Sequence, residues 1–306
     1  MTDKHLTDIS FKSLNLAPEL LQGIEDSGFS YCTPIQAGTL PIVLRGNDVA
    51  GQAQTGTGKT AAFLVAAFQH MLSNAPEGGN HKQPRALMLA PTRELAIQIH
   101  KDAVNIGRHL PFKLGLAYGG TGYESQRKTI EDGIDILIGT PGRIIDYFKQ
   151  HVFNLKQIQV MVLDEADRMF DLGFIKDIRY LLRRMPEPEK RMSMLFSATL
   201  SFRVQELAYE HMNNPEKVEI EPEQVTAEQI IESVYYPAKE EKIPLLLGIL
   251  KSIPDARAVV FVNTKRVGER VDAYLQGNGY KVALLSGDVP QTKRTRLLKE
   301  FTEGEL

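Results

Sequence analysis

The residues "AQTGTGKT" (53–60) stand between a strand-like run, "DVAGQA" (48–53), and an apolar helical run, "AAFLVAAF" (61–68). They nearly match the phosphate-loop pattern G-x-x-x-x-G-K-[ST], with Ala53 in the first glycine position. A strand, a glycine-rich loop and a helix in this order are typical of an α/β domain that binds a nucleotide phosphate. A glycine-rich turn before an ordinary core helix is the alternative, and the Lys-Thr pair argues against it.

Each part of this loop has a physical role in the hypothesis. Gly56 and Gly58 allow the backbone to curl, so that consecutive N–H groups point at phosphate oxygens. Lys59 is expected to reach the β- and γ-phosphates, and Thr60 is expected to bind Mg²⁺. The loop residues expected to contact nucleotide are Ala53, Gln54, Thr55, Gly56, Thr57, Gly58, Lys59 and Thr60.

A second acidic motif, "VMVLDEAD" (160–167), fits the same chemistry. Its apolar residues predict a buried strand with Asp164 at the carboxyl end, where open α/β sheets bind ligands. Asp164 can complete the Mg²⁺ shell, and Glu165 is the candidate to orient and deprotonate the attacking water. An acidic strand end is often only a helix cap, but the phosphate loop favours the catalytic interpretation. The predicted catalytic residues are therefore Lys59, Asp164 and Glu165.

Apolar runs alternate with helical patterns along the chain, which predicts a doubly wound α/β fold with a parallel sheet. Helices are expected at 93–106 and 173–185, among others. The expected strands of the first half lie at 48–53, 86–90, 114–118, 135–139, 160–164, 194–198 and 217–220.

A polar, acidic segment with a proline at 221–229 predicts a linker between two domains, as the length of 306 residues suggests. The first domain is expected at 1–220, with an adenine-recognition segment at 9–37, and a partial second domain at 230–306. In the second domain we expect strands at 233–237, 258–263 and 282–287, and helices around 240–252, 265–277 and 290–303.

Composition argues against a membrane-inserted or secreted protein and against a generally basic surface. The net charge of −2 means that nucleic acid would have to bind a local patch and not a general positive field. Cys32 is the single cysteine, so no internal disulfide can form, which fits a reducing cytoplasm. The longest apolar run, 61–68, is far too short to span a bilayer.

The motifs occur in an order that resembles the DEAD-box RNA helicases. The matching stretches are "GFSYCTPIQ" (28–36), "AQTGTGKT" (53–60), "PTRELA" (91–96), "GG" (119–120), "TPGR" (140–143), "DEAD" (164–167), "SAT" (197–199), "VVFVNTK" (259–265) and "QTKR" (291–294). The resemblance implies two tandem RecA-like domains, the second incomplete, and unwinding of short RNA duplexes coupled to ATP and Mg²⁺. Stretches such as "DRMFDLGFIKDIR" (167–179) are most similar to the branch that works in bacterial RNA degradosomes. That similarity implies a role in RNA degradation and an endoribonuclease scaffold as a partner.

The resemblance also implies how adenine is recognised. Gln36 carries a side-chain amide that can pair with the adenine edge, and Phe29 is placed to stack on the base. Phe11 would either help to close the same pocket or simply pack in the core. Cys32 stands where the family often has proline, a departure that puts nothing essential in doubt.

The remaining motifs are expected to bind RNA through its backbone and 2′-OH groups, or to couple hydrolysis to RNA grip. Ordinary turns are the alternative for Gly119-Gly120 and for Pro141-Gly142, each taken singly. The expected RNA contacts are Pro91, Thr92, Arg93, Gly119, Gly120, Thr140, Gly142, Arg143, Gln291 and Arg294. The expected coupling residues are Asp167, Ser197 and Thr199.

The basic run from Lys176 to Arg191 reads first as the solvated face of an amphipathic helix, with an RNA or partner role as the alternative. The family's later Thr-Asp and Arg-rich motifs are not found in 1–306, so we expect a truncated chain with weak or no ATPase and helicase activity. Two other functions stay open: a DNA helicase, and an ATP-regulated RNA-binding or scaffold protein without helicase activity.

Overall fold

The computed structural model describes residues 6–75, 82–120, 122–220, 231, 233–253 and 257–306. The chain forms two compact units, Met1–Glu223 and Gln224–Leu306. The linker expected at 221–229 lies outside the described residues.

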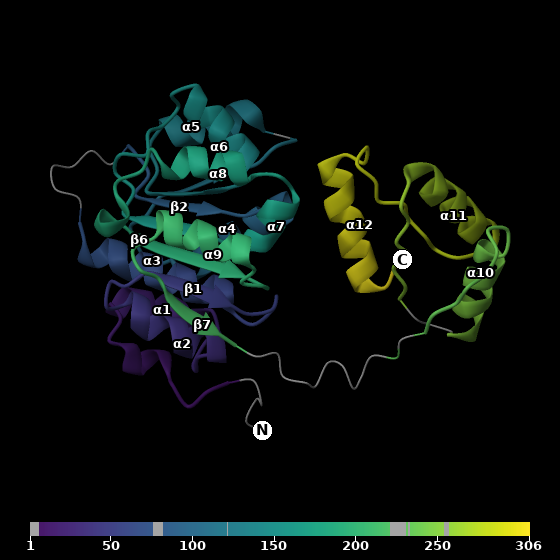
Figure 1. Ribbon diagram of the computed structural model, residues 1–306, viewed down its shortest axis with the longest axis horizontal. Coiled ribbons are helices and arrows are strands. Elements are labelled where there is room, and N and C mark those ends of the chain that lie inside the picture. The colour runs from purple at the N-terminus through teal and green to yellow at the C-terminus, as the bar shows by residue number, and fades with distance from the viewer. Residues whose placement is uncertain (1–5, 76–81, 121, 221–230, 232, 254–256) are drawn as a thin grey trace. The chain divides into compact units, whose positions relative to one another are not determined.

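The first unit is built on a seven-stranded sheet in the order β3-β4-β2-β5-β6-β1-β7, in which every neighbouring pair is parallel (Figure 1). The expected strands of this half are confirmed, with ends that differ by a residue or two. Their bounds are β1 Val49–Gln52, β2 Ala86–Leu89, β3 Leu114–Ala117, β4 Ile136–Gly139, β5 Val160–Leu163, β6 Met192–Ser197 and β7 Glu216–Glu219.

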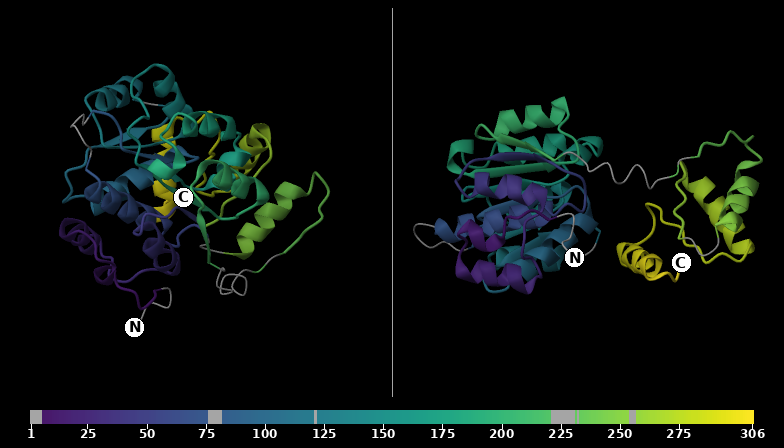
Figure 2. Two further views of the ribbon diagram at one scale, coloured as in Figure 1. Left: turned by 60° about the vertical axis from the view of Figure 1, so that its left-hand side comes forward. Right: turned by 90° about the horizontal axis from the view of Figure 1, so that it is seen from below.

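Helices cover both faces of this sheet (Figures 1 and 2). Because successive strand side chains point to opposite faces, Met88 of β2 joins one apolar cluster while Leu87 and Leu89 join the other. The first cluster packs against η1 Phe11–Leu14, α1 Pro18–Asp26, α2 Pro34–Val43, α3 Lys59–Ser73 and α4 Arg93–Ile106. The second packs against α5 Tyr123–Glu131, α6 Pro141–Lys149, α7 Ala166–Asp171, α8 Ile175–Leu182 and α9 Phe202–His211.

Strand order brings distant motifs together at the carboxyl edge of the sheet. β6 lies between β1, which leads into the phosphate loop, and β5, which is followed directly by Asp164. The backbone N–H of Ala53 donates to the carbonyl of Ser197 at 3.1 Å, so the phosphate loop starts beside the end of β6. Ligands of open parallel sheets bind at this edge, so the functional residues are expected to lie there.

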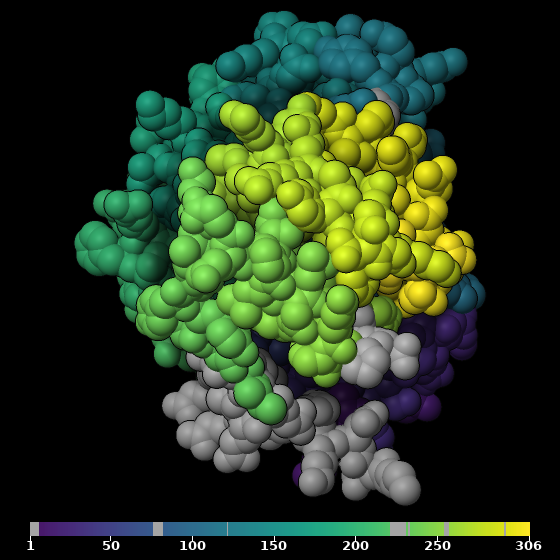
Figure 3. Space-filling model, turned by 90° about the vertical axis from the view of Figure 1, so that its right-hand side faces the viewer, coloured from purple at the N-terminus to yellow at the C-terminus, as the bar shows by residue number. Residues whose placement is uncertain are grey.

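The second unit, green to yellow in the space-filling view of Figure 3, contains three helices among its described residues. They are α10 Lys242–Ser252, α11 Lys265–Gly277 and α12 Gln291–Glu303, and all were expected from the sequence. The prediction of strands at 233–237, 258–263 and 282–287 is wrong for this structure, because none of these segments pairs with another strand among the described residues. Tyr236 is 93% exposed and Phe261 is 92% exposed, so these β-prone residues have no covered face to pack against.

Within the described ranges of both units, no helix combines the length and the apolar character that crossing a membrane requires.

Candidate functional site

The phosphate loop has the left-handed backbone that its glycines allow. Gly56 and Gly58 have φ values of +83° and +90°, which side-chain-bearing residues rarely adopt. Gly58 is also the N-cap of α3, so the N-terminus of that helix opens directly from the loop. The Thr57 hydroxyl donates to the carbonyl of Gln54 at 2.7 Å and closes the turn. This is the backbone curl that the sequence predicted for phosphate binding.

Lys59 and Asp164 are buried charges that meet at this loop. Lys59 is 5% exposed, and its Nζ donates to the carbonyl of Ala53 at 2.7 Å. Asp164 is 3% exposed, and its Oδ1 accepts from the N–H of Glu165 at 3.0 Å. Burial raises the pKa of Asp164 to about 6, although the positive charge of Lys59 acts in the opposite direction. A buried carboxylate of raised pKa is suited to binding a cation that offsets its desolvation.

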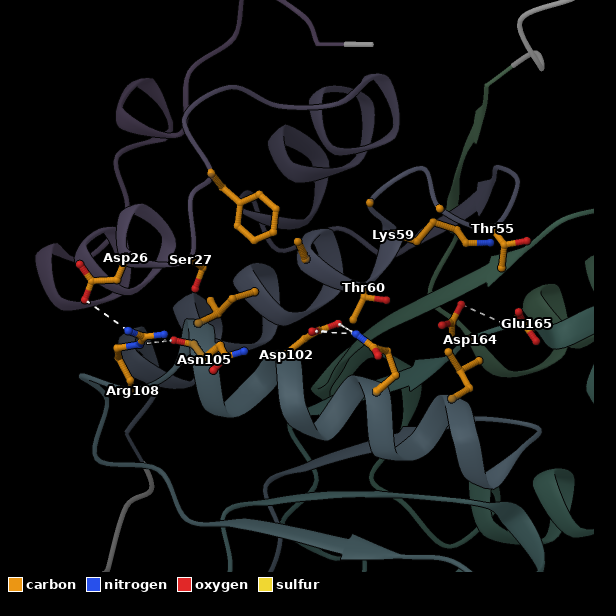
Figure 4. A pocket seen from close by; sticks show the side chains of 17 residues that line it. Asp26, Ser27, Thr55, Lys59, Thr60, Asp102, Asn105, Arg108, Asp164 and Glu165 are labelled. Carbon is orange, nitrogen blue, oxygen red and sulfur yellow. Dashed lines mark hydrogen bonds and ion pairs between the residues drawn. The ribbon is translucent and has the colours of Figure 1, made fainter. Parts of the chain in front are cut away.

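Glu165 lies in an unusual backbone conformation. Its φ of 51° and ψ of 52° are left-handed, which costs a non-glycine residue about 1–2 kcal/mol. Oε2 of Glu165 lies 3.3 Å from Nη1 of Arg168, and the side chain is 12% exposed. The strained backbone turns this carboxylate onto the cavity wall beside Asp164 (Figure 4).

The predicted coupling residues form one hydrogen-bonded group. Oδ2 of Asp167 accepts from the N–H of Thr199 at 3.1 Å and from its hydroxyl at 3.2 Å. The N–H of Asp167 donates to the Ser197 hydroxyl at 3.2 Å. The end of β6 is thereby tied to α7, which begins directly after Glu165.

A cavity of about 650 Å³ opens beside the phosphate loop, within the usual range for small-molecule sites. Figure 4 shows Lys59, Thr60, Asp164 and Glu165 toward one end of it. Several lining residues were not identified from the sequence, although a polar row at helical spacing on α4 was a usable signal. These are Asp26, Ser27, Gln98, Asp102, Asn105 and Arg108.

The aromatic residues expected at the adenine site lie in different environments. Phe29 is 38% exposed and lines the cavity. Phe11 is 1% exposed, with its ring centroid 6.4 Å from that of Phe29. Of the two roles considered for Phe11, the structure favours core packing. Phe29 has an exposed ring face on the cavity, and its stacking on a base remains a prediction.

Gln36 is placed against the protein and not on the cavity wall. It is 1% exposed, its Oε1 accepts from the N–H of Thr33 at 2.8 Å, and its Nε2 donates to the carbonyl of Gly58 at 3.0 Å. The amide therefore caps α2 and holds the phosphate loop, which is an indirect link to the nucleotide. Direct pairing of this amide with adenine remains a prediction.

The side chains that could hold Mg²⁺ are few. Among the described residues, no group of three or more His, Cys, Asp or Glu side chains could enclose a metal. Thr60 and Asp164 do line the same cavity, and a hydroxyl with a carboxylate suits Mg²⁺, which keeps waters and shares substrate phosphates. The donor set fits a nucleotide-bound ion and not an all-protein site.

The first-unit residues expected to bind RNA lie at the ends of three adjacent strands, β3, β4 and β2. The Arg93 guanidinium lies so close to Gly120 that an added methyl group there would collide with it. Thr92 caps α4, Gly142 is open to solvent, and Pro91 and Thr140 are buried. A Cβ added at Gly119 would also contact the Arg93 guanidinium, at 3.5 Å from Nη2.

Arg143 is held by neighbours that the sequence did not single out. Its Nη1 donates to the Tyr147 hydroxyl at 3.1 Å and to Oε1 of Gln126 at 3.3 Å. Its Cζ lies 4.7 Å from the ring centroid of Tyr123, within cation–π range. In the second unit, Arg294 donates from Nη2 to the carbonyl of Ser286 at 2.9 Å, and Gln291 begins α12.

The basic run on α8 is partly neutralised. Arg179 pairs with Glu206 and Glu210, at 3.3 and 2.9 Å, and the Arg184 guanidinium stacks on the Tyr180 ring. Ile178, Leu181 and Leu182 are buried, as the amphipathic pattern predicted.

Comparison with known proteins agrees with the geometry. The family model "DEAD/DEAH box helicase" matches residues 33–207, and "Helicase conserved C-terminal domain" matches residues 241–306. The ATP-dependent RNA helicases RhlB of Shewanella oneidensis and Aeromonas salmonicida are 56% and 58% identical over the whole chain. The chain spans 70% and 72% of the lengths of these two relatives.

Solved structures show the same relationship. A DEAD box protein from Methanococcus jannaschii aligns with a TM-score of 0.63 and 30% identity, covering 97% of this chain and 78% of that one. The S. cerevisiae protein dbp5, solved with gle1 and IP6, aligns with a TM-score of 0.69 and 29% identity, covering 98% of this chain and 73% of that one. With the phosphate loop, the acidic strand end and the similarity over the whole of this chain in agreement, the chain belongs to the DEAD/DEAH box helicase family.

Proposed function

We propose that this protein is an ATP-dependent RNA helicase that separates short RNA duplexes through ATP binding and hydrolysis. The observation that carries the proposal is the meeting of buried Lys59 and buried Asp164 in one cavity with the glycine-rich loop and Glu165. Buried charges of this kind are costly unless an opposite charge offsets them. A nucleoside triphosphate with Mg²⁺ would supply a negative charge for Lys59 and a positive charge for Asp164.

The residues divide the chemistry among them. The loop N–H groups and Lys59 hold the phosphates, while Thr60 and Asp164 would hold Mg²⁺, which neutralises charge on the β- and γ-phosphates. Glu165 orients the attacking water and accepts its proton. Its left-handed backbone fixes the carboxylate before substrate arrives, so little reorganisation is needed at the moment of reaction.

RNA would bind at the neighbouring strand ends, where Arg93 and Arg143 offer guanidinium groups to phosphates without reading sequence. Asp167 and Thr199 connect the acidic motif that follows β5 to the end of β6. We propose that this hydrogen-bonded group transmits the state of the γ-phosphate to the RNA-binding segments. Gln291 and Arg294 are proposed as further RNA contacts in the second unit.

The cellular role is part of the same proposal. The sequence resemblance and the similarity to proteins named RhlB support work in RNA degradation, with an endoribonuclease scaffold as partner. We propose a cytoplasmic location, which a chain with a single unpaired cysteine suits.

The first prediction tests the catalytic assignment with Glu165→Gln. This change keeps the shape of the side chain but removes its basicity, so the RNA-stimulated ATP turnover of the parent chain, expected to be weak, should fall further, by at least about 100-fold. ADP affinity, measured by calorimetry, should stay within about threefold of the parent, because Glu165 does not hold the phosphates. Lys59→Ala should instead weaken nucleotide binding itself.

The matched control is Glu131→Gln, which breaks another helical ion pair, Glu131 with Arg127 at 2.9 Å, away from the cavity. It should leave turnover unchanged. A parent chain that binds RNA but neither binds nor hydrolyses ATP would point to a scaffold protein. Competition between RNA and DNA of equal sequence separates an RNA helicase from a DNA helicase.

A further inference from the structure

The nucleotide cavity extends well beyond the phosphate loop, along one face of α4. Its lining includes Leu95, Gln98, Asp102 and Asn105, which recur at the spacing of a single helical stripe. A different stripe of α4, about a third of a turn around the helix, includes Ala96, Ile99 and Ala103, which are buried in the first apolar cluster. The polar stripe therefore faces a cavity that the proposed nucleotide must enter.

The regular rise of α4 gives the positions of its residues along this cavity. α4 begins beyond the carboxyl end of β2, which is hydrogen-bonded to β5, the strand that Asp164 directly follows. At about 1.5 Å per residue, Asp102 lies about 10 Å along the axis from Leu95, and Asn105 lies about 15 Å along it. Figure 4 shows Asp102 between the end with Lys59 and Asp164 and the end with Asp26, Ser27 and Arg108.

The parts of a nucleotide follow the same order. Its phosphates belong at the glycine-rich loop, and its base belongs against Phe29, the exposed aromatic side chain of the cavity. Phe29 follows two residues after Ser27, which lines the far end of the cavity. The sugar connects base and phosphates, so we place it in the middle of the cavity, beside Asp102.

Asp102 has the chemistry to bind that sugar. Its two carboxylate oxygens accept from Nε2 of Gln98 at 3.0 and 3.1 Å, which fixes the orientation of the group. A carboxylate has about four acceptor positions, so the bond to Gln98 leaves capacity for hydroxyl donors. Dinucleotide-binding folds use an acidic side chain in the same way, to accept a hydrogen bond from a ribose 2′-OH.

We propose that Asp102, oriented by Gln98, accepts hydrogen bonds from the ribose hydroxyls and makes the site prefer ribonucleotides over 2′-deoxyribonucleotides. The inference rests on the proposed function, because it takes the nucleotide to lie with its phosphates at Lys59 and its base at Phe29. Asp102 binds the ligand directly, and Gln98 is a positioning residue.

Equilibrium binding tests this proposal without any need for turnover. Calorimetry with ADP and with 2′-deoxy-ADP, both in the presence of Mg²⁺, should give a parent affinity about tenfold higher for ADP, the usual effect of one charge-assisted hydrogen bond. Asp102→Ala should bind ADP about tenfold more weakly and bind 2′-deoxy-ADP as the parent does, so that the ratio approaches one. Asp102→Asn keeps one acceptor oxygen and should give an intermediate ratio, as should Gln98→Ala.

The matched control is Asp146→Ala. Asp146 also accepts from a glutamine four positions away, Nε2 of Gln150 at 2.9 Å, but it lies on α6 and does not line the cavity. It should keep the parent ratio, and circular dichroism should show every variant folded. Equal parent affinities for the two nucleotides, or an unchanged ratio in Asp102→Ala, would overturn the ribose assignment while leaving ATP binding intact. A parent that binds neither nucleotide would overturn the proposed function as well.

Discussion

At the scale of single residues, Arg143 illustrates how a surface cation is held in one orientation. Tyr147 is fully buried, and its hydroxyl donates to the carbonyl of Tyr123 at 2.6 Å while accepting from Arg143. Burial raises the pKa of Tyr147, so its phenol keeps the proton that it donates. Gln126 accepts from both Arg143 and the N–H of Tyr118. These bonds tie Arg143 to both ends of the segment that contains Gly119 and Gly120.

Tyr147→Phe should therefore weaken RNA binding indirectly, through the position of Arg143. The ring and its packing remain, but Arg143 loses an acceptor and the Tyr123 carbonyl loses its donor, at a cost of about 1–2 kcal/mol in stability. Affinity for single-stranded RNA, measured by fluorescence anisotropy with an ATP analogue, should fall about three- to tenfold. ADP affinity should not change.

Tyr180→Phe is the control for this substitution. Tyr180 also packs against an aromatic ring, that of Phe148 with centroids 6.1 Å apart, but it lies on α8 away from the strand ends. Loss of RNA affinity in both variants, or in neither, would show that the Tyr147 hydroxyl does not position Arg143.

Residue identity predicted which polar side chains share the cavity better than it predicted their supports. Lys59, Thr60, Asp164 and Glu165 line one cavity as expected, because phosphate chemistry requires their functional groups at fixed spacings. The bridging of Gln36 to the Gly58 carbonyl could not, because an amide offers the same donors and acceptor to a base and to a backbone. Only packing decides which partner it takes.

At the scale of elements, the approach of α1 to α4 shapes the far end of the nucleotide cavity. A Cβ added at Gly23 of α1 would collide with the carbonyl oxygen of Ile106 at the end of α4. Asp26 and Ser27, which end α1, and Asn105 of α4 line that end of the cavity. The glycine thus sets the distance between two of its walls.

Gly23→Ala should destabilise this packing. Because the obstacle is backbone and cannot rotate away, the helices must separate, and the free energy of unfolding in urea should fall by about 1–3 kcal/mol. ADP affinity should also fall, since the cavity wall moves. Gly142→Ala is the control: nothing lies within 4 Å of its added methyl group, and its stability should change by no more than about 1 kcal/mol.

The strands show where sequence patterns succeed and fail at this scale. "ALML" (86–89) and "VVFVN" (259–263) are both short apolar runs that the sequence predicted as strands, and the second has the more β-prone residues. The first forms β2 because β4 and β5 supply hydrogen bonds on both sides and helices cover both faces. The second pairs with nothing among the described residues, and composition alone cannot reveal whether a partner strand is present.

At the scale of the whole molecule, burial is distributed unevenly between the two units. The first unit contains two apolar clusters, one on each face of its sheet. In the described part of the second unit, the buried apolar side chains are Val271, Leu275 and Leu297. Because apolar burial is the main favourable term in folding, the units should differ in resistance to local opening.

Native-state hydrogen exchange, followed by mass spectrometry, tests this difference. Amides of β1, β2 and β5 should be the most protected, and those of α10 and α11 should exchange at least about 100-fold faster. β7 provides an internal control, because it belongs to the first unit but its residues are largely exposed and, in the part of the chain that the structure describes, it pairs with β1 alone. Intermediate protection of β7 would assign the gradient to burial within each element. If α11 were as protected as β5, Val271 and Leu275 would contribute far more stability than their small cluster implies. The amount of apolar burial would then not explain the difference in resistance to local opening between the two units.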